Sequence, residues 1–535
     1  MPDLNPEELR GSRTGVYVGT FNSETVEICN ANVDSIQGYV LTGCQRAMFA
    51  NRVSYTFDFK GPSYVVDTAC SSSTYALVHA VADIRAGKCD AAIVAGACLD
   101  LLPATSLPFH RLNMLSPEGR CAAFDASGCG YVRSEAVVTV LLQRRRDCRR
   151  LYCTVRGAGT NSDGYKAQGI TYPTGAIQRQ LAQETFKEAH LRPQDVAYFE
   201  AHGTGTRAGD PEEVNAIAGL FCEGRTTPLL LGSVKSNMGH SEPASGLCSI
   251  AKVVVAMERG VIPGNLHYKT PAPEIPALSD GRIKVVDRNT PWQGGLVAVN
   301  SFGFGGANAH VILESQGGER PPPASYPAPR LVLASGRTEA AVVRLLKLAA
   351  AHPRDAELHA LLDAVHARAI PRHTYRGYAV LNPKRNTPPV LEATEMEVTE
   401  TRPVWFVFAG MGSQWSGMAR TLMQLPIFAA SIARLAAALR PLNFDLIYVL
   451  TEAPEVAFDN ILNSAVSITA VQIALVDVLR EAGVRPDGIL GHSVGENAHL
   501  ATTAVHESIA SQRDSVTVLT TGTENRLYNF PITLV

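Results

Sequence analysis

The sequence predicts an α/β fold in which mixed or parallel sheets are covered by helices on both faces. Across residues 1–315, short apolar runs alternate with segments of helical periodicity. Several of these runs are apolar at every position, as strands buried on both faces are. The chain has 535 residues, 46% of them hydrophobic, which is material for roughly three or four domains of ordinary size.

The expected elements follow one another in βα order. A helix with an apolar stripe follows the second strand, over residues 71–84, and further helices are expected at residues 174–190 and 213–222. Asp210 is expected to cap the last of these, with Pro211 in its first turn. The apolar runs that we interpret as strands lie at residues 14–20, 64–66, 91–95, 137–142, 151–155, 196–199, 229–231 and 296–300.

Composition changes divide the remainder of the chain. The proline-rich stretch SQGGERPPPASYPAPR begins at Ser315 and predicts a stiff, extended connector. We therefore expect a first domain over residues 1–315, a small α/β linker domain over 316–400 and a second α/β unit over 401–496. The tail, residues 497–535, is polar and weakly patterned, and no structure is predicted for it.

The composition argues against several classes of partner. The net charge is -2, which offers no electrostatic reason to bind nucleic acid or an anionic membrane. No apolar run reaches the roughly 18 residues of a membrane-spanning helix, and the polar N-terminus resembles no secretory signal. The 11 cysteines form no CxxC pair. We expect a cytoplasmic protein with reduced thiols and no membrane insertion.

One cysteine and two histidines stand out as candidate catalytic residues. Cys70 in VDTACSSS lies between an apolar run and a helical one, where a helix N-terminus would lower the pKa of its thiol, whereas burial alone would raise it. His202 ends the run VAYFEAH, and His240 follows GSVKSNMG. Lys235, five residues before His240, would disfavour an imidazolium and keep His240 neutral. A thiol with two imidazoles favours nucleophilic catalysis.

Other interpretations of these residues are weaker. A single buried cysteine is more often an inert core residue, and a histidine in a glycine-rich turn is mostly structural. The separations of Cys70, His202 and His240 match no standard zinc site. The glycines around Phe304 lie between two apolar runs rather than before a helix, which argues against a dinucleotide site. No metal and no bound nucleotide is expected.

Four motifs resemble the β-ketoacyl synthases. VDTACSSS, EAHGTGT, GSVKSNMGH and NSFGFGGANAH occur in the order found in that family and cover about residues 10–315. The chain then resembles the next parts of animal type I fatty acid synthase, namely a linker domain and the start of a malonyl/acetyl transferase with GMGSQW and GHSVGE. The resemblance implies a thiolase-like layered αβαβα ketosynthase followed by part of an α/β-hydrolase-like acyltransferase.

The resemblance also implies a mechanism and partners. Cys70 would take an acyl group from the phosphopantetheine arm of an acyl carrier protein, and His202 and His240, supported by Lys235, would assist decarboxylation of a malonyl group. Backbone N–H groups of Cys70 and Phe304 would form the oxyanion hole. The protein would be a homodimer without a bound cofactor. By the same resemblance, Thr204 and Thr206 would contact the pantetheine arm.

Ser493 in GHSVGE fits the strand-to-helix elbow of acyltransferases, and Gln414 in GMGSQW resembles an oxyanion partner. The resemblance ends just after Glu496, and the family's partner histidine lies further downstream than this sequence reaches, so little transferase activity is expected. The family's opening strand also precedes TGVYVGTF. Its loss would expose strand edges, so we expect a truncated chain that folds poorly alone.

Two alternative functions stay open from the sequence. The first is a polyketide synthase ketosynthase, which would differ in the domains that accompany it. The second is a catalytically dead fragment that acts as a scaffold or dimerisation partner.

Overall fold

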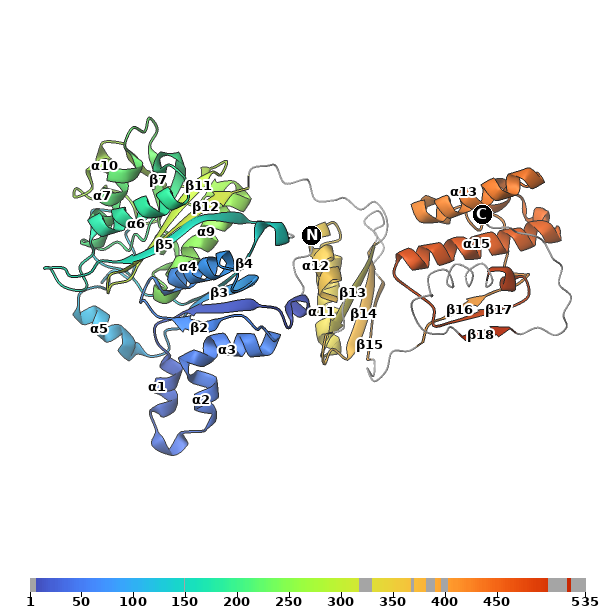
Figure 1. Cartoon of the computed structure of the whole chain (residues 1–535), viewed down its shortest axis with the longest axis horizontal. Helices are drawn as coiled ribbons and strands as arrows, with labels where there is room; N and C mark the ends of the chain where they lie inside the picture. The colour runs from blue at the N-terminus through green and yellow to red at the C-terminus, as the bar shows by residue number, and fades with distance from the viewer. Residues whose placement is uncertain are drawn as a thin grey trace. The chain divides into compact units, whose positions relative to one another are not determined.

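A computed structural model gives the structure of the chain as two units, Met1–Met396 and Glu397–Val535 (Figure 1). It describes residues 6–148, 150–316, 330–366, 370–381, 390–395, 403–498 and 517–520. The predicted proline-rich connector falls largely outside the described residues, as does most of the tail after Ala498.

The first unit opens with a four-stranded sheet in the order β2-β1-β3-β4. Strands β2 and β3 flank β1 in parallel, and β4 runs antiparallel to β3. Every residue of β1 is buried, as expected for a strand whose sequence is mostly apolar. The strands are β1 (Thr14–Gly19), β2 (Ser63–Val66), β3 (Ala91–Cys98) and β4 (Ala136–Gln143).

A six-stranded sheet follows, in the order β5-β12-β11-β6-β7-β9. Strands β11, β6, β7 and β9 are parallel, whereas β12 is antiparallel to both β11 and β5. A separate two-stranded ribbon pairs β8 (Val261–Ile262) with β10 (Thr290–Pro291). The strands of the large sheet are β5 (Cys153–Ser162), β6 (Val196–Glu200), β7 (Leu229–Gly232), β9 (Ile283–Val285), β11 (Leu296–Phe302) and β12 (Ala307–Ser315).

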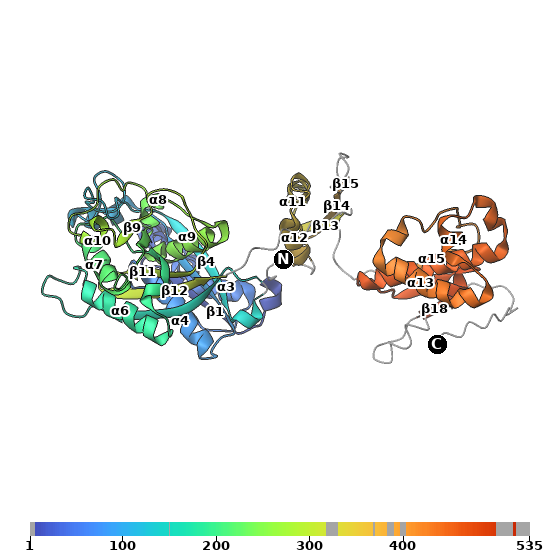
Figure 2. The ribbon, with the colours of Figure 1, turned by 90° about the horizontal axis from the view of Figure 1, so that it is seen from above.

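Helices complete five layers. Helices α4 and α9 contact both sheets and each other, so they form the central layer, while α3 covers the outer face of the first sheet and α6 and α7 cover that of the second (Figure 2). The predicted αβαβα arrangement is confirmed. The helices of this part are α1 (Glu24–Asn30), α2 (Tyr39–Cys44), α3 (Arg46–Phe57), α4 (Ser72–Arg85), α5 (Ser106–Arg111), α6 (Gly175–Glu188), α7 (Gly209–Phe221), α8 (Lys235–Met238), α9 (Ser245–Arg259) and α10 (Pro276–Ser279).

Two local predictions were wrong. Helix α7 begins at Gly209, before the expected start, and Asp210 does not cap it. The Asp210 carboxylate instead accepts hydrogen bonds from the N–H groups of Phe124 at 2.8 Å and Gly205 at 3.1 Å, so it holds two loops together. Strand β5 begins at Cys153 and continues to Ser162, well beyond residue 155, because it pairs with β12 along this whole length.

The linker part of the first unit is a three-stranded antiparallel sheet in the order β13-β14-β15. Helices α11 and α12 cover one face of this sheet (Figure 2). Val342 and Leu346 of α11 pack there against the sheet residues Val332 and Ala379. The elements are β13 (Arg330–Gly336), α11 (Glu339–Ala351), α12 (Ala356–His366), β14 (Tyr375–Leu381) and β15 (Val390–Glu395).

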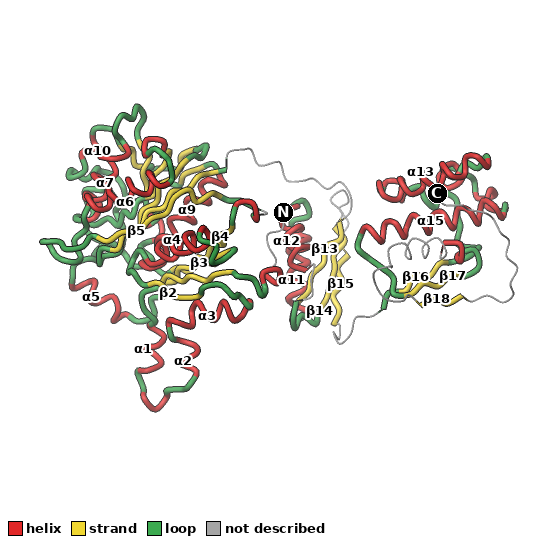
Figure 3. Tube along the Cα trace, viewed as in Figure 1, coloured by secondary structure: helices red, strands yellow, loops and turns green. Residues whose placement is uncertain are grey.

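The second unit has a parallel sheet in the order β16-β17-β18, drawn in yellow in Figure 3. Strand β18 lies in the tail for which no structure was predicted. Its four residues, TVLT, are too short an apolar signal within a polar tail to predict a strand, but they pair with β17 in register. The elements are β16 (Trp405–Phe408), α13 (Pro426–Leu439), α14 (Leu446–Thr451), α15 (Ile461–Glu481), β17 (Gly488–Gly491) and β18 (Thr517–Thr520).

Helix α15 is the longest described helix of this unit. It has 21 residues and, by length and hydropathy alone, could span a membrane. Core helices of globular domains pass the same test, and α15 packs against α13 and α14 through Ala470, Val471 and Ala474. One side of α15 is therefore covered by the neighbouring helices of this unit.

Candidate active site

Cys70 lies between β2 and the first turn of α4, as the sequence predicted. Ala69, just before it, has φ 54°, a left-handed conformation that is strained for alanine. The carbonyl of Cys70 accepts hydrogen bonds from the hydroxyls of Ser245 and Ser301, each at 3.2 Å. These contacts from α9 and β11 hold the cysteine backbone in a fixed position, and its side chain is 8% exposed.

The expected lowering of the Cys70 pKa was wrong. Burial, and to a lesser extent the Glu242 carboxylate, raise the pKa of the thiol to about 12. Lys235 and the backbone N–H groups of Phe304 and Cys70 act in the opposite direction on this pKa but do not outweigh burial. Desolvation of a thiolate thus dominates over the helix N-terminus.

His202 follows β6 and meets β11 through its ring. The N–H of Phe302 donates to Nδ1 of His202 at 3.3 Å. Burial lowers the pKa of His202 well below its usual value, and Lys235 and His240 lower it further, so the imidazole is neutral. Because Nδ1 accepts a hydrogen bond, the single ring proton lies on Nε2, where it is available to a substrate oxygen.

His240 lies beside His202 in the turn after α8. The two rings meet edge to face, with centroids 5.4 Å apart. His240 is 1% exposed. Burial, with Lys235 and Arg133, lowers the pKa of His240 well below its usual value. The prediction of a neutral His240 near Lys235 is confirmed in direction, with burial as the larger cause.

Lys235 is the first residue of α8 and is 1% exposed. Within the described part of the chain its ammonium has no hydrogen-bond partner. Burial lowers its pKa, whereas the carboxylates of Glu200 and Glu213 raise it. Burying an amine without a hydrogen-bond partner costs free energy of folding. A protein that keeps such a group beside two imidazoles typically uses it for function.

Two other predicted positions lie near this group. The backbone N–H of Phe304 lies close enough to the Cys70 sulfur to lower the pKa of the thiol. The Phe304 side chain is exposed, and its ring meets that of Phe109 edge to face, with centroids 6.3 Å apart. The hydroxyls of Thr204 and Thr206 lie 3.1 Å apart in the loop after His202.

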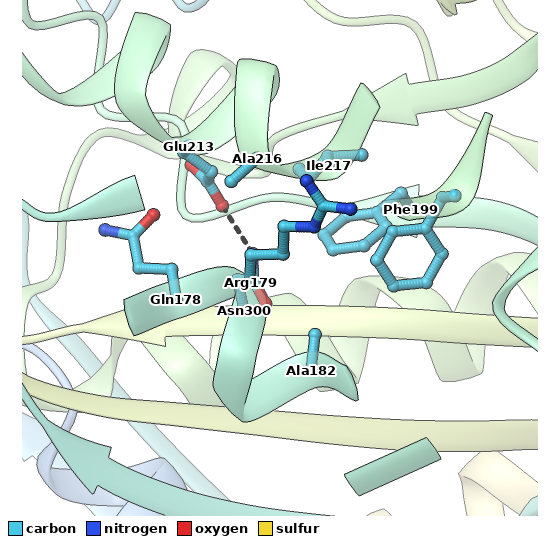
Figure 4. A pocket seen from close by; sticks show the side chains of 9 residues that line it. Gln178, Arg179, Ala182, Phe199, Glu213, Ala216, Ile217 and Asn300 are labelled. Carbon is cyan, nitrogen blue, oxygen red and sulfur yellow. Dashed lines mark hydrogen bonds between the residues drawn. The ribbon is translucent and has the colours of Figure 1, made fainter. Parts of the chain in front are cut away.

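Glu213 is a site residue that sequence reasoning missed. Its carboxylate accepts hydrogen bonds from the N–H groups of His202 and Gly203, both at 2.8 Å, and from the amide of Asn300 at 2.9 Å. The same Asn300 contacts Nδ1 of His310 at 2.7 Å. Figure 4 shows Glu213 and Asn300 lining a small pocket between α6, α7 and the sheet. Its sequence signal is a glutamate in an otherwise apolar helical face.

A second charged cluster lies behind His240. Cys98, Asp100 and Glu242 place ligand atoms within 4.8 Å of one another, as a metal site would. The guanidinium of Arg133 lies between the two carboxylates, 2.7 Å from Asp100 and 3.0 Å from Glu242. A cation of the protein itself therefore lies where a metal ion would bind.

In the second unit, Ser493 has the geometry of a strained elbow. It follows β17, is exposed, and has φ 54°, which is unfavourable for serine. A Cβ on Gly410 would come within 2.9 Å of the Ser493 Cβ, so the loop after β16 approaches closely. The carbonyl oxygen of the Gln414 side chain accepts a hydrogen bond from the N–H of Gly412 at 2.8 Å, within that loop.

Comparison with protein families gives four matches in order. The N-terminal domain of β-ketoacyl synthase matches residues 3–148 and its C-terminal domain matches 152–269. The ketoacyl-synthetase C-terminal extension matches 271–380, and the acyl transferase domain matches 405–522. The last match continues past Glu496, where the sequence resemblance was expected to end.

Individual relatives include both fatty acid and polyketide synthases. The fatty acid synthase of Anser anser anser is 55% identical over 258 residues, 48% of this chain and 73% of that protein. The hybrid PKS-NRPS synthetase pytA of Aspergillus terreus is 35% identical over 537 residues, 92% of this chain and 80% of that protein. A phenolphthiocerol/phthiocerol polyketide synthase of Mycobacterium tuberculosis is 36% identical over 524 residues, which make up 92% of this chain but only 28% of that protein.

Solved structures agree on the ketosynthase fold. The oxazolomycin ketosynthase domain of Streptomyces albus JA3453 aligns with a TM-score of 0.64 and 30% identity, covering 71% of this chain and 68% of that one. The ketosynthase from module 6 of the Bacillus subtilis 168 bacillaene synthase gives a TM-score of 0.61 and 29% identity, covering 70% and 66%.

Proposed function

The chain belongs to the β-ketoacyl synthases of multidomain fatty acid and polyketide synthases. We propose that it carries out the reaction of this family. It extends an acyl chain by two carbons through a decarboxylative Claisen condensation, as part of a fatty acid synthase. The observation that carries the proposal is the pair of neutral imidazoles, His202 and His240, meeting edge to face at 5.4 Å beside an anchored cysteine.

The first step loads the acyl group. The sulfur of Cys70 attacks the acyl thioester of a carrier protein, its proton passes to the departing carrier thiol, and a Cys70 thioester remains. The N–H groups of Cys70 and Phe304 stabilise the oxyanion of the tetrahedral intermediate. The high pKa of the Cys70 thiol means that the proton leaves as the carbon–sulfur bond forms, because a free thiolate is scarce.

The second step uses the two histidines. A malonyl thioester loses CO₂, and the electrons of the broken bond form an enolate. The Nε2–H of His202 donates to the enolate oxygen, and His240 assists beside it. Neutral imidazoles suit this task because they donate hydrogen bonds without first losing a proton. The enolate carbon attacks the acyl carbonyl, and the Cys70 thiolate leaves and takes up a proton.

The same proposal covers the partner, the oligomeric state and the location of the protein. The partner is an acyl carrier protein whose phosphopantetheine arm runs past Thr204 and Thr206. The working protein is a cytoplasmic homodimer, and the reaction uses no metal, bound nucleotide or nucleic acid. The fatty acid assignment is supported by the 55% identity to the Anser anser anser fatty acid synthase over 258 residues.

Covalent labelling tests the proposed function. The chain is treated with a cerulenin-type epoxide and digested, and the modified peptide is identified by mass spectrometry. A ketosynthase is labelled at Cys70, and the matched Cys70→Ala variant is not. A folded chain that stays unlabelled would instead favour the scaffold function. Assay of the labelled and unlabelled chains with acyl- and malonyl-carrier protein then measures the β-ketoacyl product directly.

A further inference from the structure

The turn that carries His240 is held in a strained conformation by an ion pair. Gly239 has φ 84° and Glu242 has φ 41°, so two left-handed residues flank the histidine. For glutamate this conformation costs free energy and persists only where other contacts stabilise it. Arg133 provides those contacts: its Nε and Nη2 donate to the two carboxylate oxygens of Glu242 at 3.1 and 3.0 Å.

The segment around Arg133 also holds the backbone of His240. The N–H of His240 donates to the carbonyl of Val132 at 2.7 Å, and the N–H of Ser134 donates to the carbonyl of His240 at 3.0 Å. Arg133 lies between these two partners. Two backbone bonds and a two-pronged side-chain pair therefore join the segment to the turn, so a shift of one moves the other.

Tyr131 extends these contacts to the imidazole ring. Its ring meets that of His240 edge to face, with centroids 4.9 Å apart. Its hydroxyl donates to the Glu242 carboxylate at 3.3 Å. A single carboxylate thus stabilises both the turn beneath His240 and the aromatic ring beside it.

The guanidinium of Arg133 has little freedom to move. Besides Glu242, it contacts Asp100 at 2.7 Å, and its Nη1 donates to the hydroxyl of Ser106 at 2.8 Å. The side chains of Arg133 and Glu242 are 7% and 3% exposed. Buried charge-assisted bonds of this kind are directional and fix geometry more strongly than exposed ones.

We propose that Arg133 and Glu242 are positioning residues for His240, and that they set the rate of malonyl decarboxylation without touching the substrate. The inference rests on the proposed function. Loading of Cys70 depends on the sulfur and the N–H groups of Cys70 and Phe304, so it is spared when His240 shifts. A change to the Arg133–Glu242 pair should therefore slow decarboxylation without slowing acylation of Cys70. A general loss of structure would slow both reactions.

The test compares these partial reactions in the full chain. Acylation of Cys70 is measured with an octanoyl pantetheine thioester, and CO₂ release with a malonyl pantetheine thioester. In Arg133→Lys and Glu242→Gln, decarboxylation is expected to fall about 10- to 100-fold, the loss that a displacement of about 1 Å causes. Acylation is expected to stay within about threefold of the unmodified chain in Arg133→Lys, and not to fall in Glu242→Gln, because the carboxylate removed there raises the pKa of the Cys70 thiol.

The matched control is Arg156→Lys, which alters a half-buried pair with Glu314 in β5 and β12. It is expected to leave both rates unchanged. Tyr131→Phe keeps the ring beside His240 and removes only the bond to Glu242, so it is expected to lower decarboxylation by a smaller factor. Thermal melting confirms that each variant is folded, and Tyr131→Phe decides the outcome if the charge variants unfold.

Equal losses in both partial reactions, or no loss in decarboxylation, would overturn the positioning role. If the unmodified chain acylates Cys70 and releases CO₂ while every variant does the same, this inference alone fails. If the unmodified chain does neither, the proposed function fails, and the positioning role fails with it.

Discussion

The N–H of Phe302 donates to Nδ1 of His202 at 3.3 Å, while the neighbouring Ser301 donates its hydroxyl to the carbonyl of Cys70 at 3.2 Å. Two consecutive residues of β11 thus bind the proposed nucleophile and one of the two histidines. The strand fixes their relative position, and the Phe302 contact fixes which nitrogen of His202 carries the proton.

Replacing His202 tests that assignment. His202→Ala removes the Nε2–H donor, and the loss of one such donor costs about 100- to 1000-fold in rate. We expect CO₂ release from malonyl thioester to fall by this factor while acylation of Cys70 continues. His202→Gln, whose amide can also donate, should recover part of the loss. Equal rates in the alanine variant and the unmodified chain would contradict the assignment.

The pH dependence of Cys70 alkylation tests the electrostatics. Because the pKa of the thiol is raised to about 12, thiolate is a small fraction at neutral pH. Iodoacetamide labelling of Cys70 should therefore rise about tenfold for each pH unit between 7 and 9 without levelling off. A plateau near pH 8 would mean that the helix N-terminus prevails over burial. Quantitative peptide mass spectrometry distinguishes Cys70 from the other cysteines.

We expect the buried His310 to make the protein less stable in mild acid. It is 1% exposed, and burial lowers its pKa from the ordinary 6.5 to about 3. In the unfolded chain His310 takes up a proton near pH 6.5, whereas in the folded chain it stays neutral down to about pH 3. Its contribution to the free energy of unfolding is therefore complete above pH 6.5 and is lost as the pH falls toward 3. His310 alone is expected to contribute a loss of about 2 kcal/mol between pH 7 and pH 5.

Urea unfolding at pH 7 and pH 5 measures this loss. His310→Gln keeps a donor for Asn300 but cannot take up a proton, so its unfolding free energy should change less between the two pH values. An unaltered pH dependence in the variant would show that other groups cause the effect.

Ser493 is expected to transfer malonyl groups slowly in this chain. Its backbone has the strained elbow conformation, but in the part of the chain that the structure describes no base accepts a hydrogen bond from its hydroxyl. A serine without its base loses most of its rate. Malonyl transfer to carrier protein should therefore differ little between the chain and Ser493→Ala. Rapid transfer that disappears in the variant would contradict this expectation.

The layered fold and the position of Cys70 could be predicted because their signals are local. An apolar run before a helical stripe identifies β2 and α4, and the motif order identifies the family. The role of Glu213 could not, because its partners His202, Gly203 and Asn300 come together only through the sheet order. The direction of the Cys70 pKa shift was also wrong, since burial is a tertiary property that outweighs the helix end.

The Arg133–Glu242 pair escaped prediction for a similar reason. The two residues lie 109 positions apart, and each alone is typical of a solvated surface. Only the bridge between the segments around Arg133 and His240 brings them together in the interior.

A pulse-chase experiment at Cys70 tests the proposed condensation most directly. The chain is first loaded with a labelled acyl thioester and then given malonyl-carrier protein, and the label on the Cys70 peptide is followed by mass spectrometry. The proposed function predicts that the label leaves Cys70 as CO₂ is released and appears on the carrier in a β-ketoacyl group two carbons longer. Label that remains on Cys70, or that was attached to another residue, would contradict it.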